Sequence, residues 1–146
     1  KNLYRHYIAA CFFNNQRQLA QEIFDSQKKD FLPPSLIEND SQEKAIIDFH
    51  GENFLTTWLI LKHLAEQSCV LSFSLILGRN SHSTDKKFGS VLLAQKLFSS
   101  QTEEIKFSVN SYNPGLFTME KKEEKVKIPE LSENNIIIEA REAYFV

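Results

Sequence analysis

The sequence is short of glycine, the residue on which phosphate-binding loops depend. Its 146 residues include four glycines, and these stand apart from one another at positions 51, 78, 89 and 115. A phosphate-binding loop or a dinucleotide-binding fingerprint needs several glycines within a few residues, so that backbone N–H groups can approach the phosphates. The spacing excludes both kinds of nucleotide site, and we expect no cofactor.

Cysteine is also scarce, with two examples, Cys11 and Cys69. Two residues so far apart exclude a disulfide framework and a Cys-x-x-Cys metal site. Each lies within a run of periodically spaced apolar residues, which predicts two buried free thiols. A single disulfide between them stays an alternative.

The chain has no surplus of positive charge: 17 Lys and Arg oppose 19 Asp and Glu, for a net charge of −2. Proteins drawn to nucleic acid by overall charge carry a basic surplus, so nucleic-acid binding is not favoured. Two groups of lysines keep a nucleic-acid-binding accessory domain as a further alternative. They are Lys86, Lys87, Lys96 and Lys106, and Lys121, Lys122, Lys125 and Lys127.

Long hydrophobic runs are absent as well. The uncharged, mainly apolar stretch at residues 68–78 is far shorter than the ~20 residues that a spanning helix requires. We therefore expect no membrane span and an intracellular location, cytoplasmic or nuclear.

Phenylalanine is plentiful, with 12 residues, and the spacing of apolar residues changes near Cys69. Before it they recur every three or four positions, which predicts helices over residues 2–13, 16–28 and 41–67. Asn14 and Asn15 are a weak break, so the first two segments form either one bent helix or two helices, and Pro33 and Pro34 place a loop at residues 30–40. Asp40 and Glu43 form a variant capping box for the third helix, and Gly51 favours a kink or a break at His50-Gly51.

After Cys69 the apolar residues alternate, which predicts strands over residues 69–77, 104–111 and 136–146. In the second of these we expect Ile105, Phe107 and Val109 to face inward. Residues 116–119 form a short strand or a helical turn after a turn at 113–115. We also predict a loop at 79–87 and a short helix at 88–99. The charged segment at 120–127 is expected to be a solvated hairpin loop or an exposed helix end. The pattern indicates a single α+β domain over residues 1–146, with N-terminal helices packed on a mostly antiparallel C-terminal sheet.

Motifs with catalytic spacing are missing. His50 and Glu52 flank Gly51, but the next histidine is His63, so the His-Glu-x-x-His spacing of a helical zinc site is not met, and we expect no metal. Residues 81–85, Ser-His-Ser-Thr-Asp, contain the side chains of a catalytic triad, but neighbours in a polar loop do not converge on an oxyanion hole. We predict no catalytic residues.

Residues 70–119 resemble the acetyl-CoA-binding half of the GNAT acetyltransferases. The shared order is a strand at 70–77, a loop, a helix beginning Gly89-Ser90-Val91, a strand at 105–109, and Asn113-Pro114 with a turn. In that family, backbone N–H groups at the loop–helix junction hold the cofactor pyrophosphate. Thr84 and Lys87 stand where the family has Arg or Gln and Gly. The resemblance implies a small acyltransferase as the alternative function.

The absence of catalytic motifs favours a non-catalytic protein–protein interaction module, part of a larger protein or a multi-subunit assembly. Trp58 and Leu59 extend the apolar arc of the helix at 41–67 beyond one face, and such a helix is either central in a core or docked on a partner. A terminal strand at 136–146 would pair with a partner by strand addition. The predicted contact residues are Trp58, Leu59, Tyr144 and Phe145, and the partner is another protein or a second copy of the chain.

Overall fold

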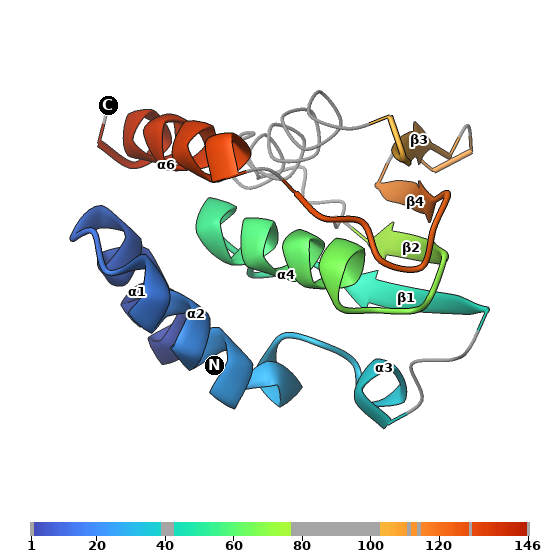
Figure 1. Ribbon diagram of the computed structural model, residues 1–146, viewed down its shortest axis with the longest axis horizontal. Coiled ribbons are helices and arrows are strands. Elements are labelled where there is room, and N and C mark those ends of the chain that lie inside the picture. Colours follow the sequence, from blue (N-terminus) through green and yellow to red (C-terminus); the bar gives the residue numbers. More distant parts are fainter. Residues whose placement is uncertain are drawn as a thin grey trace.

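The computed structural model describes residues 2–38, 43–76, 103–110, 112, 113, 115–128 and 130–145. Its elements combine helices, most of them N-terminal, with one sheet, so the predicted α+β class is confirmed (Figure 1). Their order is α1 (Asn2–Phe13), α2 (Arg17–Ser26), a 3₁₀ turn η1 (Lys28–Asp30), α3 (Pro34–Glu38), β1 (Lys44–Asp48), α4 (Phe54–Glu66), β2 (Ser72–Ile76), β3 (Ile105–Val109), β4 (Leu116–Lys121) and α6 (Glu130–Phe145).

The sheet has four strands in the order β1-β2-β4-β3. β1 runs parallel to β2 because α4 carries the chain back between them, whereas β4 is antiparallel to both β2 and β3. One row across the inner face is Ala45, Phe73, Met119 and Phe107. The sheet is therefore mixed, with two antiparallel pairings and one parallel pairing.

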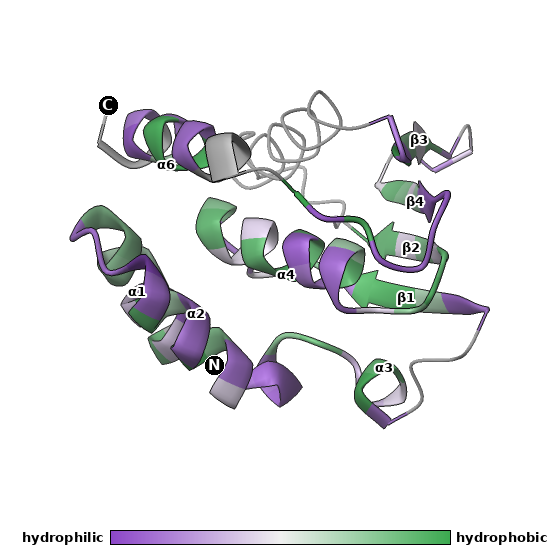
Figure 2. Ribbon diagram, viewed as in Figure 1, coloured by the Kyte–Doolittle hydropathy of each residue, from purple (hydrophilic) through white to green (hydrophobic). Residues whose placement is uncertain are grey.

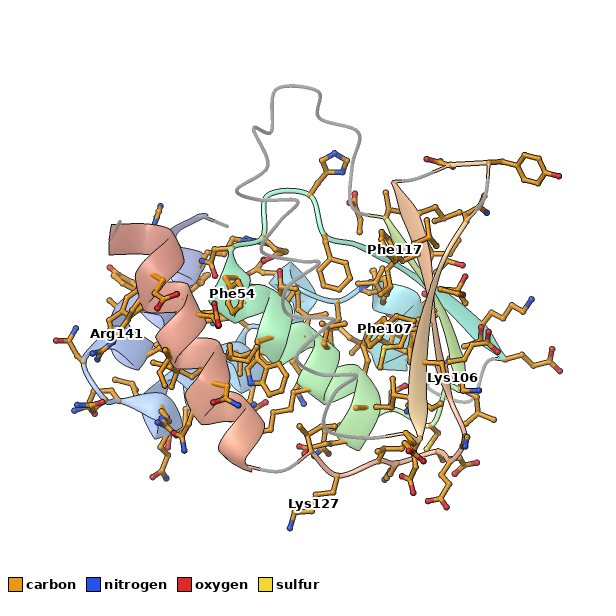
Figure 3. All side chains as sticks on the ribbon, turned by 90° about the horizontal axis from the view of Figure 1, so that it is seen from above. Phe54, Lys106, Phe107, Phe117, Lys127 and Arg141 are labelled. Atoms are coloured by element: carbon orange, nitrogen blue, oxygen red, sulfur yellow. The ribbon has the colours of Figure 1, made fainter. Side chains whose placement is uncertain are left out.

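Helix α4 lies at the centre of the molecule and contacts α1 and α6. Figure 3 shows Phe107 and Phe117 on the side of the sheet that faces α4, and Lys106 on the opposite side. Ten of the thirteen residues of α4 are buried, which is why its sequence is apolar nearly all round. Figure 2 shows mainly hydrophobic residues on β1 and β2 and mainly hydrophilic ones in the segment after β4.

The predicted helix at 41–67 is wrong for the described residues before position 54. Residues 44–48 form β1, in which Ala45 and Ile47 are buried and Lys44, Ile46 and Asp48 are exposed. The predicted capping box fails at Glu43, which lies in a bend, and residues 40–42 are outside the described part. The helix begins instead after Asn53, with a capping box of different residues.

Gly51 makes the turn from β1 into α4 with a φ of +81°. An added Cβ would meet nothing within 4 Å, so the requirement for glycine is conformational and not steric. We expect Gly51→Ala to lower the free energy of unfolding by about 1 kcal/mol, the cost of a left-handed conformation in an L-residue. Urea denaturation measures this, with Gly51→Asn expected to cost less than Gly51→Ala. A Gly51→Ala protein as stable as the wild type would show that the turn relaxes to a negative φ.

The predicted terminal strand at 136–146 is also wrong, because these residues belong to α6 as far as Phe145. Ile136, Ile137 and Ala140 are buried while Ile138 and Arg141 are exposed, and this spacing is helical. Three consecutive isoleucines suggested a strand buried on both faces. Tertiary packing of two of them on the core overrides that local preference.

Four other predicted elements are confirmed where the structure describes the residues. Helices α1 and α2 match 2–13 and 16–28, with Asn15 at φ 60° between them, and β2 and β3 match the strands at 69–77 and 104–111. The predicted loop at 30–40 instead holds part of η1 and all of α3. Residues 116–119 form a strand, and Val109 is exposed, not inward. The loop at 79–87 and the helix at 88–99 lie outside the described residues.

Among the helices of the described residues, none combines the length and the apolar character that crossing a membrane requires.

Candidate functional site

The turn between β1 and α4 occupies the position at which parallel βαβ units commonly bind anions. Here the helix start is closed by its own side chains. Asn53 Oδ1 accepts a hydrogen bond from the Thr56 N–H at 2.8 Å, and Thr56 Oγ1 accepts one from the Asn53 N–H at 3.0 Å. The capping box satisfies donors that a phosphate would otherwise use.

A buried ion pair closes the same turn from the side of α1. Arg5 Nε donates to Glu52 Oε1 at 2.7 Å, and its Nη2 donates to Glu52 Oε2 and to the Asp30 carbonyl. The exposed fractions of Arg5 and Glu52 are 7% and 3%. The guanidinium also lies 4.9 Å from the centroid of the Phe31 ring. A buried carboxylate beside the helix start opposes anion binding, so this turn is a structural junction.

His50 and Glu52, which flank Gly51, have different partners in the structure. His50 Nδ1 lies 2.9 Å from Asp48 Oδ1 in an exposed pair, whereas Glu52 is turned inward to Arg5. Within the described ranges, no three His, Cys, Asp or Glu side chains form a group that could hold a metal ion.

Lys121 caps the carboxyl end of α4 from inside the protein. Its Nζ donates to the carbonyls of Leu64 at 2.6 Å, Ser68 at 2.7 Å and Glu124 at 2.6 Å. The last carbonyls of a helix have no partner within the helix, and a positive charge there also complements the helix dipole. Lys121 belongs to the second group of lysines considered above for nucleic-acid binding. Because its ammonium group is held inside the protein, Lys121 is not available to contact phosphates.

The segment after Lys121 continues this cap. The Val126 N–H donates to the Ala65 carbonyl and the Ile128 N–H donates to Glu66 Oε2, both at 2.8 Å. Residues 122–125 are exposed, but Lys121, Val126 and Ile128 are buried. The predicted solvated loop at 120–127 is thus correct only in its middle.

Both cysteines are free thiols in this structure, as the sequence predicted, although each is partly and not fully buried. Burial raises the pKa of the Cys11 thiol above its ordinary value. Less thiolate is therefore present at Cys11 at neutral pH than in an exposed cysteine.

Of the four predicted contact residues, the structure places two in the core and does not describe the side chains of the other two. Trp58 and Leu59 are 0% and 2% exposed and pack in the core. Tyr144 and Phe145 lie in the last turn of α6, and their side chains are outside the described part. The strand addition predicted for 136–146 is wrong, because a helix has no free strand edge.

Apolar side chains on the surface were not singled out from the sequence. Leu3 and Tyr7, on α1, are 56% and 51% exposed and lie one helical turn apart. The sequence signal for these two residues is a second four-residue apolar spacing in α1, that of Leu3 and Tyr7, in addition to the spacing of Ile8 and Phe12. Within the described ranges, the other large apolar residues that are exposed are Leu19, Ile37, Ile46, Leu71, Val109, Tyr112 and Ile138.

Comparison of the chain with protein-family models, with curated proteins and with solved structures found no match. The residues that carry the acetyltransferase resemblance at the loop–helix junction, Thr84, Lys87 and Gly89, lie outside the described residues. The acyltransferase alternative therefore stays a prediction.

Proposed function

We propose that this chain is a non-catalytic protein–protein interaction module of a larger assembly, and that α1 is a contact element. The observation that carries the proposal is the pair of exposed apolar side chains, Leu3 and Tyr7, on a helix whose other face is already buried. Ile8 and Phe12, on that other face, are fully buried in the core. A surface helix normally has one apolar face, and a second such face favours a docked partner.

The chemistry of this outer face suits a protein partner. Leu3, Tyr7 and the exposed Ala10 follow one another at four- and three-residue intervals and form a stripe along α1. Burial of a leucine side chain contributes about 1.5–3 kcal/mol, and tyrosine is enriched in protein interfaces because its ring is apolar and its hydroxyl polar. The stripe is small, so the interface extends over neighbouring surface.

We expect the double substitution Leu3→Glu/Tyr7→Glu to weaken partner binding at least about tenfold while leaving the fold intact, since both side chains point to solvent. Partners captured by the immobilised wild-type chain are identified by mass spectrometry. The purified partner is then titrated against both proteins by calorimetry.

The matched control is Gln18→Glu/Ser35→Glu, which adds the same charge at two exposed polar positions on α2 and α3. Equal affinity of the partner for the α1 variant and the control would remove α1 from the interface. A wild-type chain that captures nothing above the control resin would contradict the proposed function itself.

A further inference from the structure

The free edge of β1 carries a sequence that is complementary to itself. Among the residues that the structure describes, β1 is the first strand in the sheet order and pairs only with β2. Along a strand, the backbone N–H and C=O groups of successive residues point alternately to the two neighbouring strands. The Phe49 N–H donates to the Ile76 carbonyl at 2.9 Å, so the backbone groups of the odd-numbered residues of this segment point toward β2. The N–H and C=O groups of Lys44, Ile46 and Asp48 therefore point away from the sheet.

These three residues also present their side chains on the exposed face. Ile46 is 62% exposed, the highest value among the large aliphatic side chains of the described residues. α3 lies beyond β1 in Figure 1, but in the described part of the chain no hydrogen bond joins α3 to β1. An unpaired strand edge with an exposed aliphatic side chain is a template for another strand.

The sequence of β1, Lys-Ala-Ile-Ile-Asp, selects the partner. If two copies pair antiparallel with Ile46 at the two-fold axis, Lys44 lies opposite Asp48 of the second copy, and Asp48 lies opposite Lys44. The outward backbone groups of these residues then form the hydrogen-bonded pairs of an antiparallel ladder. A parallel pairing in register would instead place like charges beside one another, which is unfavourable.

The carboxylate of Asp48 has room for this contact. Its Oδ1 accepts a hydrogen bond from the His50 N–H at 2.9 Å and lies at the same distance from His50 Nδ1. Within the described residues its Oδ2 has no partner, so that oxygen can accept from a lysine across the two-fold axis.

We propose that two copies of this chain associate through the edge of β1. The two β1 strands pair antiparallel, so that the two sheets form one continuous sheet. The occupant is a second copy, because opposite charges meet on both sides of the axis and the two Ile46 side chains contact each other. This inference rests on the proposed function in that both assign the chain a role in protein–protein contact. It concerns a different surface, the edge of β1 instead of α1.

The test is sedimentation equilibrium of the purified chain over a wide range of concentration. We expect a monomer–dimer equilibrium. Lys44→Asp places two carboxylates opposite each other and should weaken dimerisation about tenfold or more, since a like-charge pair replaces an attractive one twice. The double variant Lys44→Asp/Asp48→Lys restores opposite charges and should recover most of the affinity. Lys29→Asp, the same charge change at an exposed site in η1, is the control.

A second measurement reads the backbone directly. In the dimer, hydrogen exchange should slow at the amides of Lys44, Ile46 and Asp48, while those of Ala45 and Ile47 are protected by β2 at every concentration. Ile46→Pro removes the central outward N–H at an edge position that tolerates proline, and it should abolish the dimer.

A chain that stays monomeric, that forms assemblies larger than a dimer, or whose dimer is insensitive to Lys44→Asp would overturn the self-association. These outcomes concern the purified chain alone. The α1 experiment measures binding to a different protein, so either proposal can fail while the other stands.

Discussion

Replacing Lys121 by methionine is expected to lower the free energy of unfolding by about 3 kcal/mol or more. The substitution keeps the length and apolar stem of the side chain and removes the charged donor. Three carbonyls, those of Leu64, Ser68 and Glu124, would then lose a charge-assisted hydrogen bond inside the protein. Each buried polar group left without a partner costs about 1–3 kcal/mol. Urea denaturation followed by circular dichroism measures the loss.

The neighbouring Lys122 provides the control for this experiment. Its side chain is exposed, so Lys122→Met should change stability by about 0.5 kcal/mol or less. If Lys121→Met proved as harmless as Lys122→Met, the ammonium group would not be what closes the end of α4. Lys121→Arg is expected to be intermediate, because the larger guanidinium does not fit a site built for one compact donor group.

Replacing Arg5 by methionine is expected to cost about 3–5 kcal/mol, the range for breaking a buried ion pair by removing one partner. The buried Glu52 carboxylate would lose the guanidinium that faces it, since the Arg5 Nε and Nη2 donors both contact this carboxylate. The Asp30 carbonyl would lose its contact as well. The thermal midpoint and urea unfolding should both fall.

A double-mutant cycle separates the pair from its surroundings. Arg5→Met/Glu52→Met removes the buried carboxylate together with its guanidinium partner, so it should be more stable than Arg5→Met alone. If the losses from the two single substitutions simply add in the double variant, the two side chains are not energetically coupled. The matched control is Arg17→Met in α2, because Arg17 is less buried than Arg5.

The helices at the N-terminus could be predicted because their apolar spacing is local. The start of β1 could not, because Ile46 and Phe49 are three apart while Ala45, Ile47 and Phe49 alternate, and both periods occur in the same few residues. The choice between them is made by β2, which supplies the pairing partner at residues 72–76. Such a decision depends on contacts that a single sequence does not display.

The buried polar contacts were harder to predict than the elements. Arg5 and Glu52 are 47 residues apart, and neither has a neighbour that indicates the other. Lys121 lies in a run of charges that suggested solvent. Its position is two residues after Met119 and four after Phe117, both buried, so the strand alternation places it on the inner face. This alternation is the sequence signal that places Lys121 on the inner face. The many charged residues that follow it favour an exposed loop instead, and the prediction followed them.

The place of β4 in the sheet has a consequence for synthesis of the protein. β4 is the last strand along the described chain, yet it lies between β2 and β3 and pairs with both. While the ribosome has delivered only the residues before it, one long side of β2 and one of β3 have no partner strand in this sheet. During synthesis, the backbone N–H and C=O groups on these two strand edges are therefore exposed to chaperones and to other chains. This exposure ends when β4, up to residue 121, has left the ribosome and can pair with both strands.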